Sequence, residues 1–139
     1  MKFLSHLKDI SKTIMLTSSF IKYQFPAIVW CGVIFFLSSL QGNEVPGLKY
    51  NTDKLAHAVV YFILGAAFHR ALKFQKNPSL VSFSLLLTVL GTFLYGMSDE
   101  FHQSFVPGRM AGWNDVLADV AGGILYVVFY MRYKFYEQK

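Results

Sequence analysis

Two short runs of polar residues carry the groups in this chain that could do chemistry. The first run extends from Asp53 to Tyr61 and the second from Asp99 to Asp119. Together they hold five of the eight carboxylates, beside segments that are otherwise apolar. Ionisable groups at the ends of membrane helices or inside them are costly, so they are usually kept because they pair, bind a ligand or react. These two runs are therefore the candidate functional site.

The first run has helical spacing. Asp53, His57 and Tyr61 follow one another at intervals of four residues, which places them on one stripe of a helix. Asp53 is positioned to orient the imidazole of His57; the alternative is that it only complements the positive end of its helix dipole. His57 lies a turn deeper, where the dipole gives no reason for it, and an imidazole is the usual group for proton transfer near neutral pH.

The second run begins with three polar side chains that share one arc of a helix. Asp99 and Gln103 are four residues apart, and Glu100 and Gln103 are three apart. Adjacent carboxylates repel unless each has its own partner, which means a proton, a basic side chain or a bound cation. A solvated helix end remains the alternative for Asp99.

A turn and a fourth helix complete the second run. Pro107 followed by Gly108 predicts a turn that ends in the guanidinium of Arg109. Asp115 and Asp119 then lie one helical turn apart on the same face. Asp115 has the position of a first-turn acid, whereas Asp119 lies roughly 6 Å deeper and is expected to face a polar cavity rather than lipid.

Composition indicates that membrane helices position these groups. The 139 residues are 54% hydrophobic and 15% charged, and the mean hydropathy is +0.39. This is one unit, and it is too apolar for an ordinary soluble protein. Four apolar segments approach the length that a bilayer requires, at 21–40, 55–72, 80–97 and 116–131. We therefore predict an all-α fold, a bundle of four transmembrane helices within residues 21–139.

Residues 1–20 form a separate basic segment. Apolar residues recur in it at helical spacing, with lysines elsewhere on the helix, which predicts an amphipathic helix at the membrane interface. A cleaved signal peptide is less favoured, because Lys12 interrupts the apolar stretch.

Basic residues predict the orientation in the membrane. Ten of the thirteen lysines and arginines lie before the first segment or at its start, at the end of the second segment or between it and the third, or after the fourth. By the positive-inside rule both termini are then cytoplasmic, and the polar site lies on the outer face of the cytoplasmic membrane. The same bias accounts for the sequence pI of about 9.4, so no nucleic-acid partner is predicted.

Several familiar chemistries are excluded. The single cysteine, Cys31, forms no disulfide within the chain. The sequence has no zinc-type spacing of Cys and His, no phosphate-binding glycine loop and no Gly-x-Ser-x-Gly motif. A proton-coupled transporter is a weaker interpretation, since no inverted repeat is visible and the third segment has no acid at its centre.

The polar groups together suit a phosphate-bearing lipid head group. Cations and helix N-termini bind phosphate, and a histidine or an acid moves the proton. The predicted catalytic residues are His57, Asp53, Glu100, Asp115 and Asp119. The predicted substrate-binding residues are Lys54, Gln103, Arg109, Tyr61 and Asp99. In the most specific version of this mechanism, His57 is base or nucleophile and is oriented by Asp53. Glu100 is then an acid or a metal ligand, and Arg109 holds the phosphate. The acid excess also suits a divalent cation, with Glu100, Asp115 and Asp119 as candidate ligands.

Three ordered motifs resemble those of the VanZ family of small bacterial membrane proteins. They are Asp53-Lys54-x-x-His57-x-x-x-Tyr61, Asp99-Glu100-x-x-Gln103-x-Phe105-Val106-Pro107-Gly108-Arg109 and Asp115-Val116-Leu117-Ala118-Asp119-x-x-Gly122, within a resemblance that runs from Trp30 to Phe129. Asp119 departs from the pattern, because the resemblance implies a frequent asparagine there.

The resemblance implies a helical membrane fold and, for the namesake of the family, a part in resistance to the glycopeptide antibiotic teicoplanin. Two functions follow as expectations. The first is an enzyme that hydrolyses or exchanges the head group of a phospholipid or lipid-linked cell-envelope precursor. The second is a protein that binds or shields such a head group without turnover. Small residues such as Ala118 and Gly122 let another helix backbone approach closely, which is mainly a packing signal, and they also permit self-association.

Overall fold

The computed structural model of the chain describes residues 10, 13, 17–43 and 50–138. All regular structure within these residues is helical. The labelled helices are α2 (Phe25–Ser38), α3 (Tyr50–Lys73), α4 (Pro78–Ser82), α5 (Ser84–Gln103) and α6 (Trp113–Glu137). The predicted all-α class is confirmed. The predicted amphipathic helix at residues 1–20 lies largely outside the described residues.

Two of the four predicted segments are interrupted. A short helix, Thr17–Tyr23, meets α2 at an angle of 45°, and Pro26 occupies the first turn of α2, where its missing N–H costs nothing. The third segment is divided into α4 and α5 at Phe83. Asn77 caps α4 by accepting a hydrogen bond of 2.9 Å from the backbone N–H of Ser79.

Two helices in the described part of the chain are long and apolar enough to cross a membrane. They are Thr52–Lys73 in α3 and Trp113–Glu137, and the bent pair ending in α2 makes a third if it counts as one span. Helix α5 is not among them; its last turns carry Asp99, Glu100 and Gln103. The chain is thus a helical membrane protein with two or three such helices, and a bundle of four spans is not confirmed.

The distribution of polarity supports a membrane environment. Thr88, Thr92 and Asp119 are completely buried, whereas many large apolar side chains are exposed on the outer surface. On α3 and α6 these include Leu55, Val59, Ile63, Leu117, Ile124, Leu125, Val128 and Phe129. So much exposed apolar surface is rare on a soluble monomer, and it is the surface that lipid would cover.

Glycines on α6 allow the helices to approach closely. A Cβ at Gly122 would lie 2.2 Å from the carbonyl oxygen of Ala58 on α3, and a Cβ at Gly123 would lie 2.3 Å from Oγ1 of Thr92 on α5. Neither space holds a methyl group. The expectation that Gly122 admits another backbone is confirmed within the chain, where that backbone is α3.

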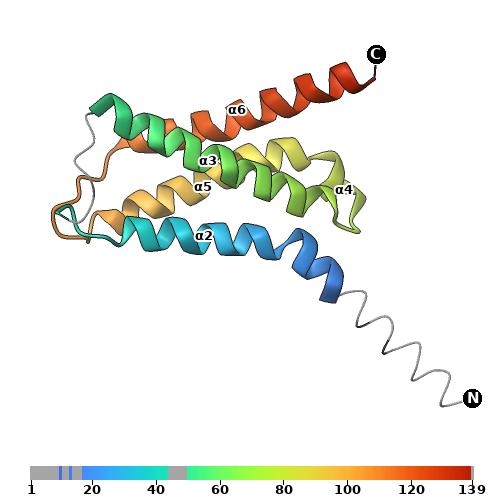
Figure 1. Cartoon of the computed structure of the whole chain (residues 1–139), viewed down its shortest axis with the longest axis horizontal. Coiled ribbons are helices and arrows are strands. Elements are labelled where there is room, and N and C mark those ends of the chain that lie inside the picture. The colour runs from blue at the N-terminus through green and yellow to red at the C-terminus, as the bar shows by residue number, and fades with distance from the viewer. Residues whose placement is uncertain (1–9, 11–12, 14–16, 44–49, 139) are drawn as a thin grey trace, which may run out of the picture.

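The helices place the two polar runs at one end of the molecule. In Figure 1 the end of α2, the start of α3, the end of α5 and the start of α6 lie together on the left. Helix α2 is attached by two hydrogen bonds to backbone carbonyls: Trp30 Nε1 donates to Val60 at 3.0 Å, and the Tyr95 hydroxyl donates to Cys31 at 2.6 Å.

Two loops meet at this end. The N–H of Gly42 donates to the carbonyl oxygen of Pro107 at 3.1 Å. A Cβ at Gly42 would lie only 2.0 Å from the carbonyl oxygen of Gly108, and Gly108 itself has a φ of +77°, which favours glycine. The turn predicted at Pro107 and Gly108 is therefore present, and it rests on the loop that follows α2.

Candidate functional site

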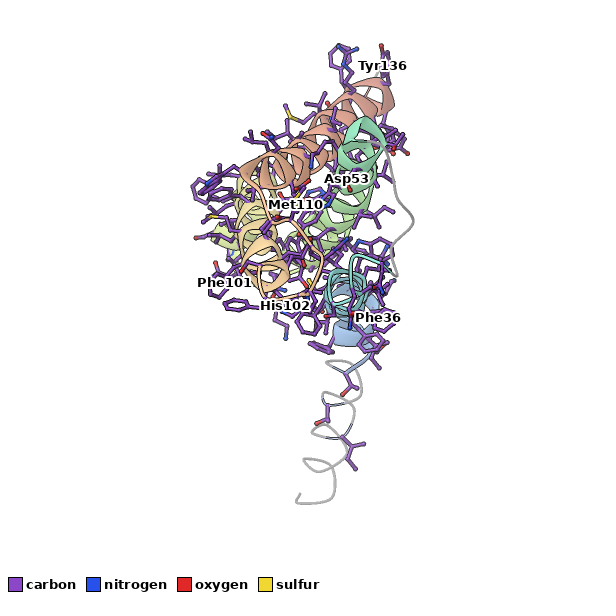
Figure 2. The ribbon with its side chains drawn as sticks, turned by 90° about the vertical axis from the view of Figure 1, so that its left-hand side faces the viewer. Phe36, Asp53, Phe101, His102, Met110 and Tyr136 are labelled. Atoms are coloured by element: carbon purple, nitrogen blue, oxygen red, sulfur yellow. The ribbon has the colours of Figure 1, made fainter. Side chains whose placement is uncertain are left out.

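The candidate site lies where the two polar runs meet. Figure 2 views the molecule from this end, with Asp53 at the start of α3, His102 near the end of α5 and Met110 in the loop between α5 and α6. Asp99, Glu100, Gln103, Asp115 and Asp119 are all buried here. Buried carboxylates in an apolar protein require compensation, so their partners define the site.

His57 is oriented by an acid on α6. Its Nδ1 lies 2.9 Å from Oδ1 of Asp119, and its Nε2 lies 3.8 Å from Oδ1 of Asp115. The expectation that Asp53 orients the imidazole is wrong: Asp119 holds the ring nitrogen, and Asp53 pairs with Lys54 at 3.1 Å. The fold brings Asp119 onto the stripe of α3, and spacing within one helix could not show this.

Lys54 connects α3 to α6. Its ammonium pairs with Asp53 and, in a very close contact, with Asp115. Two carboxylates therefore share this cation, which makes Lys54 an internal counter-ion rather than an open phosphate-binding group. Its predicted role in substrate binding remains a prediction.

The three polar residues of α5, Asp99, Glu100 and Gln103, face two different parts of the site. Nε2 of Gln103 donates to Oδ2 of Asp99 at 2.9 Å, and both side chains line the cavity described next. Oε2 of Glu100 accepts the backbone N–H of Gly112 at 2.8 Å, so this carboxylate faces the start of α6. His102 lies on the other side, 3.0 Å from the Ser39 hydroxyl and against the ring of Phe35.

A cavity of about 210 Å³ opens between α2, α3 and α5. Its polar wall contains Asp53, His57, Tyr61, Asp99, Gln103 and Arg109. Its apolar wall comes from α2 and the following loop, including Ile34, Leu37 and Leu40. The cavity is several times the roughly 30 Å³ share of one water and smaller than the roughly 300 Å³ of a small drug site, so it suits one end of a larger ligand.

Within the described part of the chain, two polar atoms at the cavity lack hydrogen-bond partners. Nε of Arg109 and the hydroxyl of Tyr61 are buried, and neither has a hydrogen-bond partner among the described residues. A guanidinium and a phenol with open donors are typical of a site for an anion such as phosphate. The roles of Arg109 and Tyr61 in substrate binding stay predictions.

Glu100 lies beyond the apolar part of α5 and outside the segments with the composition of a membrane span. Burial raises the pKa of its carboxyl to about 7, while the hydrogen bond from Gly112 opposes this effect. The neighbouring carboxylates Asp115 and Asp119 raise the pKa further. This carboxyl therefore changes its charge near neutral pH, which is unusual for an acid and frequent at functional sites.

Two groups of side chains in the described part of the chain could hold a metal ion. The first is Asp53, His57 and Asp115, and the second is His57, Glu100 and Asp119. In each group, one possible ligand atom per residue lies within 4.8 Å of the others. The predicted ligand set of Glu100, Asp115 and Asp119 is thus divided between the two groups.

Sequence reasoning missed two contributions. A Cβ at Gly96 would lie 2.8 Å from Oδ2 of Asp119, so this glycine makes room for the buried acid. Ile34, Leu37 and Ser38 of α2 line the cavity. A signal existed for both, because Gly96 precedes Glu100 by one helical turn and the α2 residues have helical spacing, but only the fold shows what they face.

The exposed apolar helices and the buried polar end define a helical membrane protein with one ionisable site at one end of its helices. The chain matches the VanZ/LLP1 family over residues 4–134, nearly its whole length, and therefore belongs to that family. No curated protein and no solved structure matches the chain.

Proposed function

We propose that this protein acts on the phosphate-bearing head group of a membrane lipid, a phospholipid or a lipid-linked cell-envelope precursor, by hydrolysis or exchange. One observation carries the proposal. His57, held by Asp119 at 2.9 Å, lines the same cavity as Arg109, whose buried Nε has no partner in the described part of the chain. A proton-transfer group and an open phosphate donor thus line one cavity.

The lining of the cavity favours an amphiphile as the ligand. Apolar residues of α2 face the polar residues of α3 and α5 across it. A head group suits the polar wall, and the first methylenes of a lipid suit the apolar wall. The exposed apolar surface of the helices would place this cavity next to lipid.

In the proposed chemistry, His57 acts first as a general base and then as a general acid. With Nδ1–H donated to Asp119, Nε2 is free to accept a proton. A water or hydroxyl oxygen forms a bond to phosphorus and gives its proton to Nε2. The bond from phosphorus to the leaving oxygen breaks, and this oxygen takes the proton from His57. Arg109 neutralises the phosphate oxygens as charge shifts among them.

The proposal includes the topology. Four spans, both termini in the cytoplasm and the cavity at the outer leaflet of the cell membrane agree with the bias of the basic residues. Arg70, Lys73, Arg132 and Lys134 belong to helix ends opposite the site, in support of this orientation.

The decisive experiment measures turnover. The purified protein is incubated with phospholipids and with polyprenyl-phosphate precursors, with and without divalent cations, and altered head groups are identified by mass spectrometry. Turnover is expected for the parent and for His102→Gln, because His102 packs against Phe35 outside the cavity. It is expected to fall at least a hundredfold in His57→Gln.

The alternative is a head-group binding or shielding protein that contributes to teicoplanin resistance without turnover. Lipid that co-purifies equally with the parent and His57→Gln, in the absence of any turnover, would support it. Turnover that persists in His57→Gln would contradict the proton-transfer role.

A further inference from the structure

Two buried carboxylate oxygens at the site have no partner among the residues that the structure describes. Oδ2 of Asp119, a completely buried residue, and Oε1 of Glu100, which is 6% exposed, form no hydrogen bond with the described residues. The other oxygen of each group is engaged, by His57 Nδ1 and by the Gly112 N–H. An unpaired buried carboxylate oxygen is costly, so each indicates a ligand that completes it.

The two open oxygens belong to neighbouring side chains. Oδ2 of Asp119 faces α5 at Gly96, and Glu100 follows Gly96 by one helical turn. Ligand atoms of Glu100, Asp119 and His57 lie within 4.8 Å of one another. Atoms on opposite sides of a cation with bonds of about 2.1 Å are about 4.2 Å apart, so carboxylates this close are near the spacing that one shared cation requires.

The neighbouring acids, Asp53 and Asp115, do not lack a positively charged partner. Asp53 and Asp115 both pair with the ammonium of Lys54, which supplies positive charge to that side of His57. In the described part of the chain, no lysine or arginine forms an ion pair with Glu100 or Asp119, and Asp119 pairs with the imidazole of His57 instead. The deficit of positive charge therefore lies between α5 and α6.

We propose that Glu100 and Asp119 bind a divalent cation of the Mg²⁺ or Mn²⁺ class between α5 and α6, beside His57. Two carboxylate ligands with the remaining positions filled by water are typical of Mg²⁺, which keeps much of its hydration shell. Asp119 then bridges, with Oδ1 on His57 and Oδ2 on the cation, and the histidine stays free to transfer a proton through Nε2.

The site also deepens the proposed function, and this part rests on that proposal. A phosphate in the cavity beside His57 would replace cation-bound water with its own oxygens. The cation would then neutralise one side of the phosphate while Arg109 neutralises the other. Cation binding itself requires no lipid, so the two proposals are tested separately.

The test is a titration of the purified full chain with Mn²⁺, in a detergent without phosphate groups, followed by electron paramagnetic resonance of the free ion. We expect one site per chain, which Mg²⁺ displaces. Glu100→Gln and Asp119→Asn should each weaken binding at least tenfold. Glu137→Gln is the matched control, because Glu137 lies at the far end of α6 and pairs with Lys134.

Asp53→Asn distinguishes the two groups of acids. Loss of Mn²⁺ binding in Asp53→Asn, with binding retained in Glu100→Gln, would overturn the assignment in favour of the group beside Lys54. Absence of saturable binding by the parent would overturn the proposal altogether and indicate that a shared proton satisfies the two carboxylates.

Melting temperatures guard against misfolded variants. Mn²⁺ should raise the melting temperature of the parent and of Glu137→Gln and leave that of Asp119→Asn unchanged, since only a ligand of the folded state stabilises it. An equal rise in all three proteins would overturn the assigned ligands. Turnover without cation binding, or binding without turnover, would separate the failure of one proposal from that of the other.

Discussion

Gly122→Ala tests how closely α3 and α6 must approach for the site to form. The added Cβ would lie 2.2 Å from the carbonyl oxygen of Ala58 and 2.9 Å from the backbone N of Phe62. A carbon normally lies no closer than about 3.3 Å to such an oxygen, so the two backbones must separate by about 1 Å. Both obstacles are backbone atoms, so no rotation of a side chain relieves the contact.

The separation should break the link between His57 and Asp119. His57 precedes Ala58, and Asp119 precedes Gly122 by three residues. Their contact of 2.9 Å would lengthen toward about 4 Å, beyond hydrogen-bond distance. Overpacking costs about 1 to 3 kcal/mol and the lost hydrogen bond to a charged group about 1.5 to 3 kcal/mol, so the melting temperature should fall by about 5 °C or more.

Gly32→Ala is the matched control. A Cβ at Gly32 on α2 meets nothing within 4 Å, so this variant gains the helix propensity of alanine without a clash. The melting temperature of each variant is compared with the parent, and nuclear magnetic resonance of ¹⁵N-labelled histidine reports on the imidazole of His57. If Gly122→Ala melts like Gly32→Ala and leaves the His57 resonances unchanged, the close approach does not position the site.

Three further predictions concern the polar groups. Gly96→Ala should disturb the His57 resonances, because its Cβ would lie 2.8 Å from Oδ2 of Asp119, and unchanged resonances would contradict this account. Lys54→Met should lower the free energy of unfolding by about 3 kcal/mol by leaving Asp115 buried without its cation, as chemical denaturation can measure. The pKa of Glu100 is raised from 4.5 to about 7, so at pH values between these two the folded state binds more protons than the unfolded state. Without divalent cations, stability should therefore fall as the pH rises through about 7, and Glu100→Gln should remove this part of the pH dependence.

Helical spacing was sufficient to predict which residues share a face. Asp53, His57 and Tyr61 line one cavity, and Asp99 and Gln103 form a hydrogen bond, as intervals of four residues indicate. The partner of His57 could not be predicted in this way. Asp119 lies 62 residues away, and its approach depends on glycines whose importance is visible only once the helices are packed.

The boundaries of the apolar segments were harder to predict. Hydropathy averages over about twenty residues, whereas the division at Phe83 and the bend before Phe25 depend on local backbone geometry. The acids at the end of α5 also shorten its apolar stretch. The feature that favours a functional site thus weakens the signal of the helix that carries it.

The contact between Gly42 and Gly108 connects two parts of the cavity that would have to move when it opens. The loop after α2 is bonded to the turn that precedes Arg109 through the N–H of Gly42 and the carbonyl oxygen of Pro107. The same α2 supplies the apolar wall of the cavity. While this hydrogen bond holds, a sideways movement of the end of α2 also moves the turn. The apolar wall of the cavity and the Arg109 guanidinium then move together.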